Sequence, residues 1–147
     1  MIQFKDGYYA DVRTEDRCRT VISYKGGVPE EMKTRVEKQA FIRVYDGNLW
    51  YYASVTDVDR IQETLDGLYA AASENPRILD DPIVRRFENN HDVISNFGEC
   101  SVRDIPLREK QELLLSYLPI LSEDPSVKIP EGIYLDRNSM FTFVSSS

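Results

Sequence analysis

The chain has 147 residues, 41% of them hydrophobic and 11% aromatic, so it is long enough to bury a core as one domain. Its formal net charge of −7 argues against nucleic acid or an anionic membrane as the main partner, because both require clustered Lys and Arg. There is neither a signal-like apolar segment at the start nor an apolar run of about 18 residues. We therefore expect a cytoplasmic protein with reduced thiols, and a Cys18–Cys100 disulfide is disfavoured there.

The first 38 residues predict three strands. Residues 8–13 (YYADVR) and 18–25 (CRTVISYK) alternate apolar and polar side chains, which is typical of strands. The charged residues 14–17 predict a turn between them. Gly26-Gly27 predicts a second turn, and residues 28–38 alternate again as a third strand.

The stretch that organises the rest of the chain covers residues 41–73. Two alternating apolar runs are joined by Asp46-Gly47-Asn48, and Asp-Gly between such runs predicts a hairpin because Gly adopts positive φ at little cost. A helix is expected to begin at Thr56 or Asp57, where Thr56 and Asp59 resemble a capping box. Its apolar face comprises Val58, Ile61, Leu65, Leu68 and Ala72.

Residues 74–103 lack strong periodicity, and a segment of this length is typical of a functional loop or a linker. Within it, a helical turn is expected at residues 83–87. A second helix is predicted over residues 106–118, with Asp104 as its N-cap. Pro119 is expected to end or kink this helix, because proline lacks the backbone N–H that the helix needs.

Two further strands are predicted at residues 127–135 and 140–145, with a turn at residues 136–138. The elements together predict an α+β fold, with a mostly antiparallel meander sheet of about four strands plus a C-terminal strand pair, covered by two main helices. The final strand runs to the last residue, so we expect the segment to be part of a longer protein. The expected single domain comprises 1–73 (meander plus helix), 74–103 (long irregular loop) and 104–147 (helix plus two strands).

No group of residues assembles into a recognisable active site. His91 is the only histidine, which excludes a two-histidine zinc motif within the chain. A thiol enzyme using Cys100 with His91 as base is one alternative, but a surface histidine and an inert cysteine are favoured. A second group is an acidic cluster with nearby arginines, formed by Asp80, Asp81, Glu88, Arg85 and Arg86. A third group is the aromatic run of Trp50, Tyr51 and Tyr52. We assign no catalytic, cofactor-binding or metal-binding residue.

Five stretches share their order and spacing with one known family. They are residues 8–13, 20–32 (TVISYKGGVPEEM), 41–54 (FIRVYDGNLWYYAS), 105–115 (IPLREKQELLL) and 133–147 (IYLDRNSMFTFVSSS). They resemble the N-terminal domain of the TldD/PmbA family, once labelled modulators of DNA gyrase and now regarded as related to metalloproteases. The residues that match family positions are Arg43, Gly47, Trp50, Ala53, Ser54 and Lys110. The family's His-Glu-x-x-x-His metal-binding helix lies in its C-terminal domain, and no residue of this chain matches it.

The resemblance implies the non-catalytic N-terminal part of a cytoplasmic, dimeric zinc metallopeptidase. This part would help to shape the substrate channel for peptides and contact a second subunit or the C-terminal catalytic domain. Zinc is implied only for the full-length protein, so we expect the segment alone to hold no cofactor and to be inactive. No nucleic acid or membrane partner is expected. The alternative is a stand-alone α+β protein-interaction module without a proteolytic role, which predicts no exposed strand edge at residues 140–144.

Overall fold

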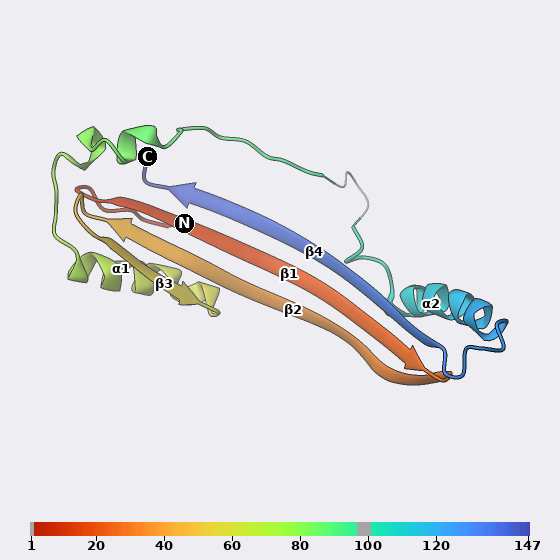
Figure 1. Ribbon diagram of the computed structural model, residues 1–147. Helices are drawn as coiled ribbons and strands as arrows, with labels where there is room; N and C mark the ends of the chain where they lie inside the picture. The colour runs from red at the N-terminus through yellow and green to blue at the C-terminus, as the bar shows by residue number, and fades with distance from the viewer. Residues whose placement is uncertain (1, 97–100) are drawn as a thin grey trace. The chain divides into compact units, whose positions relative to one another are not determined.

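The computed structural model describes residues 2–96 and 101–147. Four strands form one antiparallel sheet in the order β3-β2-β1-β4 (Figure 1). The strands are β1 (Tyr9–Lys25), β2 (Val28–Tyr45), β3 (Trp50–Val55) and β4 (Glu131–Ser145). The helices are α1 (Ile61–Ala71) and α2 (Leu107–Ser122), with 3₁₀ turns η1 (Val58–Arg60), η2 (Ile78–Asp80) and η3 (Val84–Arg86). The predicted α+β fold is confirmed.

The chain divides into two compact units. Unit 1 comprises Met1–Asp16, Glu37–Ile94 and Met140–Ser147, and unit 2 comprises Arg17–Val36 and Ser95–Ser139. The long strands β1, β2 and β4 therefore contribute residues to both units.

The core of unit 1 lies between one face of the sheet and α1. Side chains alternate across a strand, so the even-numbered residues of β1 and β2 point to the same face. The buried residues of this core are Ala10, Val12, Ala40, Ile42, Val44, Ile61, Leu65 and Tyr69. Val58, Leu68 and Ala72 pack against them, so the predicted apolar face of the helix is confirmed. Complete burial of Leu65 contributes about 2–3 kcal/mol, and truncation to Ala would cost about 3 kcal/mol.

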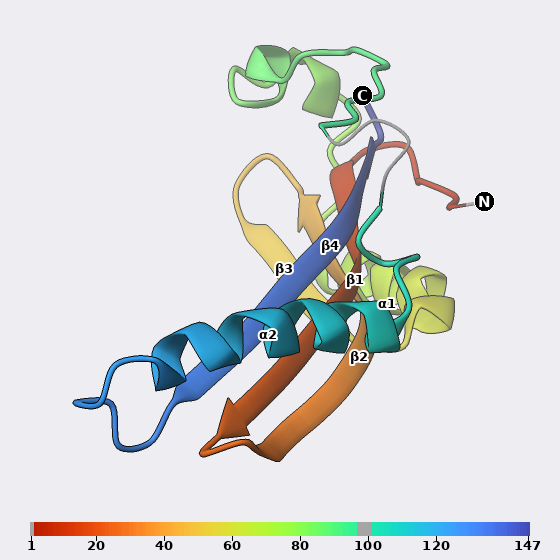
Figure 2. The ribbon, with the colours of Figure 1, turned by 90° about the vertical axis from the view of Figure 1, so that its right-hand side faces the viewer.

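The core of unit 2 is formed by α2 lying across β1 and β4 (Figure 2). Leu114 and Leu118 of α2 pack with Ile22 and Tyr24 of β1. Gly132 of β4 lets the helix approach closely, because a Cβ there would lie 2.6 Å from Leu118 Cδ2. Any larger residue at position 132 would force the helix side chain to move.

The hairpin between β2 and β3 is confirmed. Gly47 has φ +95°, in the left-handed region that glycine tolerates best. Asp46 Oδ1 accepts hydrogen bonds from the backbone N–H groups of Asn48 and Leu49, both at 2.8 Å. Burial alone would raise the pKa of Asp46, but hydrogen bonds from the N–H groups of Leu49, Asn48 and Ser73 and from the Tyr51 hydroxyl together outweigh it and hold the pKa below its usual range. The side chain of Asp46 thus fixes the turn that the Asp-Gly pair predicted.

Two predicted turns are wrong, because β1 and β4 each run unbroken through them. At residues 14–17, cross-strand partners on β2 satisfy the charged side chains, since Gln39 Nε2 donates to Glu15 at 2.8 Å and Lys38 lies 3.4 Å from Asp16. At residues 136–138, Asp136 is buried within β4 in an ion pair with α2. The predicted division of residues 28–45 into two strands is also wrong, because β2 is continuous.

The helix boundaries need smaller corrections. Asp57 caps η1 by accepting the N–H of Asp59, so the predicted start at Asp57 is confirmed, but not a capping box from Thr56. At α2 the cap residue is Pro106 without a side-chain bond, so Asp104 as N-cap is wrong. The helix also continues past Pro119 to Ser122, so the proline does not end it.

Candidate functional site

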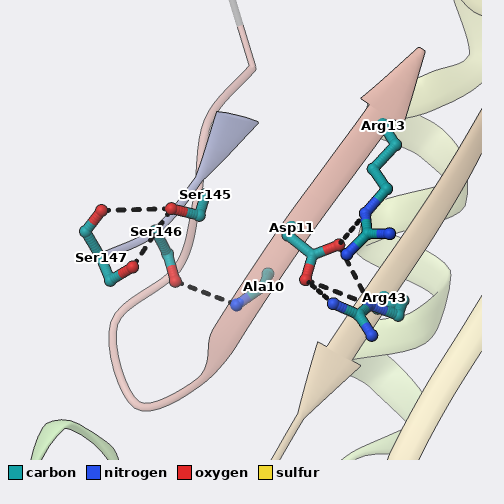
Figure 3. A network of polar contacts seen from close by, with 7 residues as sticks. All are labelled: Ala10, Asp11, Arg13, Arg43, Ser145, Ser146 and Ser147. Atoms are coloured by element: carbon teal, nitrogen blue, oxygen red, sulfur yellow. Dashed lines mark hydrogen bonds and ion pairs between the residues drawn. The ribbon is translucent and has the colours of Figure 1, made fainter. Parts of the chain in front are cut away.

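The most deeply buried charge of unit 1 is Asp11 on β1, which is 0% exposed. Arg43 on β2 lies beside it, with Nε 3.1 Å from both carboxylate oxygens, and its Nη2 also donates to Oδ2 (Figure 3). Arg13 approaches the same carboxylate at 3.9 Å. Two guanidinium groups therefore surround one buried carboxylate, which supplies the charge compensation that a buried anion requires.

An aromatic cluster continues from Arg43. Its guanidinium lies 4.8 Å from the centre of the Trp50 ring, within the range of a cation–π contact. Trp50 stacks on Tyr45 at 4.7 Å, and Phe87 stacks on Tyr9 at 4.6 Å. Burial, the negative charge of Asp11 and a hydrogen bond to it raise the pKa of Tyr9 to about 12. Tyr9 therefore stays neutral at physiological pH.

Residues 74–87 are not merely a linker. Ile78 of η2 and Val84 of η3 are buried against Tyr9 and Tyr45, and Trp50 packs against the same cluster. A helical turn expected at residues 83–87 is present as η3. The aperiodic sequence is explained by two short 3₁₀ turns, which each bury a single apolar side chain.

Unit 2 holds a second buried charge pair. Lys110 of α2 is 4% exposed and Asp136 of β4 is 9% exposed, with Nζ 2.8 Å from Oδ2. Lys110 also donates to Thr20 Oγ1 at 3.2 Å, and the Tyr134 hydroxyl donates to Asp136 at 2.7 Å. Burial would raise the pKa of Asp136, but the hydrogen bonds from Lys110 and Tyr134 outweigh it and lower the pKa. Burial and this same hydrogen bond raise the pKa of Tyr134 to about 12.

Both networks are saturated. Among residues 2–96 and 101–147, every fully buried side-chain nitrogen or oxygen has a hydrogen-bond partner. The networks therefore tie neighbouring elements together, and the described residues also include exposed apolar surfaces.

One such surface is an open apolar groove of about 660 Å³ in unit 2. It lies beside the turn between β1 and β2 and the C-terminal end of α2. Leu113, Tyr117 and Ile120 on α2 are also exposed. The residues that line the groove are Gly26, Gly27, Leu115, Leu118, Pro119, Ser122, Glu123, Lys128 and Pro130.

The residues considered from the sequence do not come together into a site. His91 is exposed in an irregular segment, and Asp80 forms an exposed ion pair with Arg85. Cys18 is a buried free cysteine, whereas Cys100 lies outside the described residues, as do the disulfide and thiol-enzyme hypotheses that depend on it. In the aromatic run, Trp50 is packed in the cluster of unit 1 and Tyr52 is exposed.

Within the described ranges, no three His, Cys, Asp or Glu side chains are grouped closely enough to hold a metal ion. The described residues therefore offer no ligand set for a zinc ion, and we assign none to them. None of the helices in the described part of the chain combines the length and apolarity that a bilayer crossing requires.

Sequence reasoning missed Asp11, Lys110 and Asp136 as members of buried networks. For Lys110 a signal was present, because it follows Leu107 by three residues and precedes Leu114 by four, on the apolar face of the helix. A charge on such a face requires a buried partner. That partner, Asp136, stands in the run that was instead interpreted as a turn.

Comparison with known proteins places these features in a family context. Residues 10–75 match the model of the family described as PmbA/TldA metallopeptidase domain 1. The matched segment includes nearly all of β1, all of β2, β3 and α1, and the Asp11–Arg43 pair. The resemblance to the TldD/PmbA family is therefore confirmed. Among curated protein sequences, no match was found.

Two solved structures share the fold. One is a candidate modulator of a DNA gyrase from Thermotoga maritima MSB8, with a TM-score of 0.72 at 8% identity over 95% of this chain. The other is a candidate modulator of DNA gyrase from Bacteroides thetaiotaomicron VPI-5482, with a TM-score of 0.67 at 14% identity over 94% of this chain. The chain spans 32% of the length of each, so it corresponds in fold to about one third of these larger proteins.

Proposed function

We propose that this chain is the non-catalytic N-terminal domain of a TldD/PmbA-like zinc metallopeptidase of the cytoplasm. In this role it helps to shape the channel that admits peptide substrates, and it contacts a second subunit or the catalytic domain. The observation that carries the proposal is the match of residues 10–75 to domain 1 of a metallopeptidase family. The similarity in fold to one third of two longer proteins supports the same assignment.

The chemistry of the chain is consistent with a supporting role. Two pairs of its buried charges, Asp11–Arg43 and Lys110–Asp136, are tied to each other, and α2 and β4 carry exposed apolar side chains. Such surfaces are typical of contacts with other protein parts. The His-Glu-x-x-x-His helix of the family is absent from this sequence, so hydrolysis would depend on another domain or subunit.

The test is to recover the native protein that contains this chain, with its bound partners, after chemical crosslinking in the cell. We expect a His-Glu-x-x-x-His helix either in the same polypeptide beyond Ser147 or in a crosslinked partner, and zinc-dependent peptide hydrolysis by the recovered assembly. The isolated 147-residue chain serves as the control and should neither bind stoichiometric zinc nor cleave peptides. Cleavage by the isolated chain, or the absence of the motif from both polypeptides, would overturn the proposal.

The alternative, a self-contained interaction module, makes a testable prediction about the edge of β4. A closed module should not leave an apolar strand edge exposed at residues 140–144. In the described structure β4 is an edge strand, and Met140 and Phe141 on it are exposed. This observation favours a domain that is completed by another protein surface.

A further inference from the structure

The end of β4 is an edge strand without the usual protection. β4 is the outermost strand in the order β3-β2-β1-β4, and its residues 140–144 contain no charge and no proline. Met140 is 61% exposed, Phe141 68% and Phe143 54%. Natural edge strands are normally shortened, charged or bulged, because free backbone groups beside apolar side chains recruit other strands.

The sequence of this segment is symmetric in residue type. It reads Ser-Met-Phe-Thr-Phe-Val-Ser, with Thr142 at the centre. We propose that residues 140–144 pair antiparallel with the same segment of a second copy of this chain, about a two-fold axis at Thr142. In this register Phe141 faces Phe143 of the second copy, Met140 faces Val144, and Thr142 faces itself. Aromatic–aromatic and Thr–Thr pairs are among the favourable cross-strand pairs, and an isologous contact requires such self-complementarity.

The backbone of β4 is compatible with this register. The Ser146 N–H donates to the Ala10 carbonyl of β1 at 2.9 Å. Because the N–H and C=O groups of alternate residues point to opposite sides of a strand, those of Phe141 and Phe143 are expected to point to the free edge. They are the groups that would bond to the second copy, and Thr142 would then form a non-hydrogen-bonded pair on the axis.

A second copy is the occupant that the charges favour. Each chain carries a net charge of −7, so two copies repel each other at most surfaces. Residues 139–147 carry no charged side chain, and the strands can therefore pair along this edge without placing like-charged side chains opposite each other. The pairing assigns specific residues to the contact with a second subunit, and in this respect it rests on the proposed function.

The oligomeric state of the 147-residue chain tests the pairing. One strand pair is a small interface, so we expect a reversible dimer with a Kd of about 1–100 µM by sedimentation equilibrium. The double variant Phe141→Lys/Phe143→Lys places Lys opposite Lys and should weaken dimerisation at least about tenfold. The matched control is Val28→Lys/Val36→Lys, which makes the same kind of change at exposed positions of the inner strand β2 and should leave the dimer intact.

Complementation separates pairing from misfolding. Neither the Lys variant nor Phe141→Glu/Phe143→Glu should dimerise alone, but a mixture should form a heterodimer, because each Lys then faces a Glu. Thr142→Cys in a Cys100→Ser background should crosslink on mild oxidation, since non-hydrogen-bonded partners have Cα atoms about 4.5 Å apart. Tyr52→Cys in the same background is the exposed control and should not crosslink.

A chain that stays monomeric at all concentrations would overturn the pairing, as would a dimer that the Lys variant leaves unchanged or a mixture that fails to associate. None of these results bears on the metallopeptidase assignment, which the search for the His-Glu-x-x-x-His partner tests separately. The two proposals can therefore fail independently.

Discussion

Replacing Lys110 by Met should destabilise the protein far more than a surface substitution would. Met fills nearly the same volume but removes the charge that compensates Asp136, which is 9% exposed. Asp136 would keep the hydrogen bond from Tyr134 and lose the Lys110 ammonium at 2.8 Å. An uncompensated buried charge costs about 3–5 kcal/mol, which is a large part of the about 5–15 kcal/mol by which a typical domain is stable.

The double variant Lys110→Met/Asp136→Leu gives the opposite expectation. With both charges replaced by apolar side chains of similar size, neither desolvation nor attraction remains, and stability should return to within about 1–2 kcal/mol of the wild type. The coupling energy between the two positions should therefore be about 3 kcal/mol or more. Tyr134 would then lack its acceptor, which limits the recovery.

The double-mutant cycle compares the wild type, Lys110→Met, Asp136→Leu and the double variant by urea unfolding followed with circular dichroism. The control pair is Arg108 and Glu112, an exposed i,i+4 ion pair on the same helix at 2.7 Å, whose coupling should stay below about 0.5 kcal/mol. A loss of less than about 1 kcal/mol in Lys110→Met, or additive single effects, would refute the reasoning that this pair is buried and coupled.

Three further outcomes are expected. Arg43→Met should lower the free energy of unfolding by about 2–4 kcal/mol, because Asp11 keeps only the more distant Arg13 as a cation. The same variant should shift the fluorescence of Trp50, the single tryptophan, because the guanidinium no longer lies over its ring. An unchanged emission spectrum would contradict this contact. Tyr134 has a pKa of about 12 in the folded protein against an ordinary value of 10. Its contribution to stability is therefore complete below pH 10 and is lost between pH 10 and 12. The absorbance difference at 295 nm between wild type and Tyr134→Phe should show this late ionisation. Gly47→Ala should cost about 1–2 kcal/mol in thermal unfolding, because φ is +95° there, and a neutral effect would show that the turn adapts.

Local patterns in the sequence were sufficient for the elements whose signals are local. The Asp46–Gly47 hairpin, the apolar face of α1 and a helical turn at residues 83–87 were all predicted, because each depends on residues within a few positions. The predicted turn at residues 14–17 failed for a different reason. A charged run has the same local appearance in a turn and in a strand, and only partners more than twenty residues away, such as Lys38 for Asp16, decide between them.

The candidate site was harder to predict, since no residue in it carries a motif. Asp11 lies between two apolar residues of a strand, and its partner Arg43 is 32 residues away on the neighbouring strand. The sequence predicts both strands but not their register. The family resemblance depended on the order of weak motifs, and it could identify Lys110 and Arg43 as matching positions without indicating what they contact.

The register of β4 is determined by a few residues, because the hydrophobic pattern alone permits more than one register. A shift of β4 by two residues would keep the same side chains facing α2, so apolar patterning alone does not exclude it. Such a shift would place Tyr134 or Pro130 where Gly132 now lies, at a point where even a Cβ would be 2.6 Å from Leu118. It would also move Asp136 away from Lys110 and leave two buried charges without partners. One glycine and one carboxylate therefore select a single register within unit 2, at a strand whose sequence would otherwise permit several.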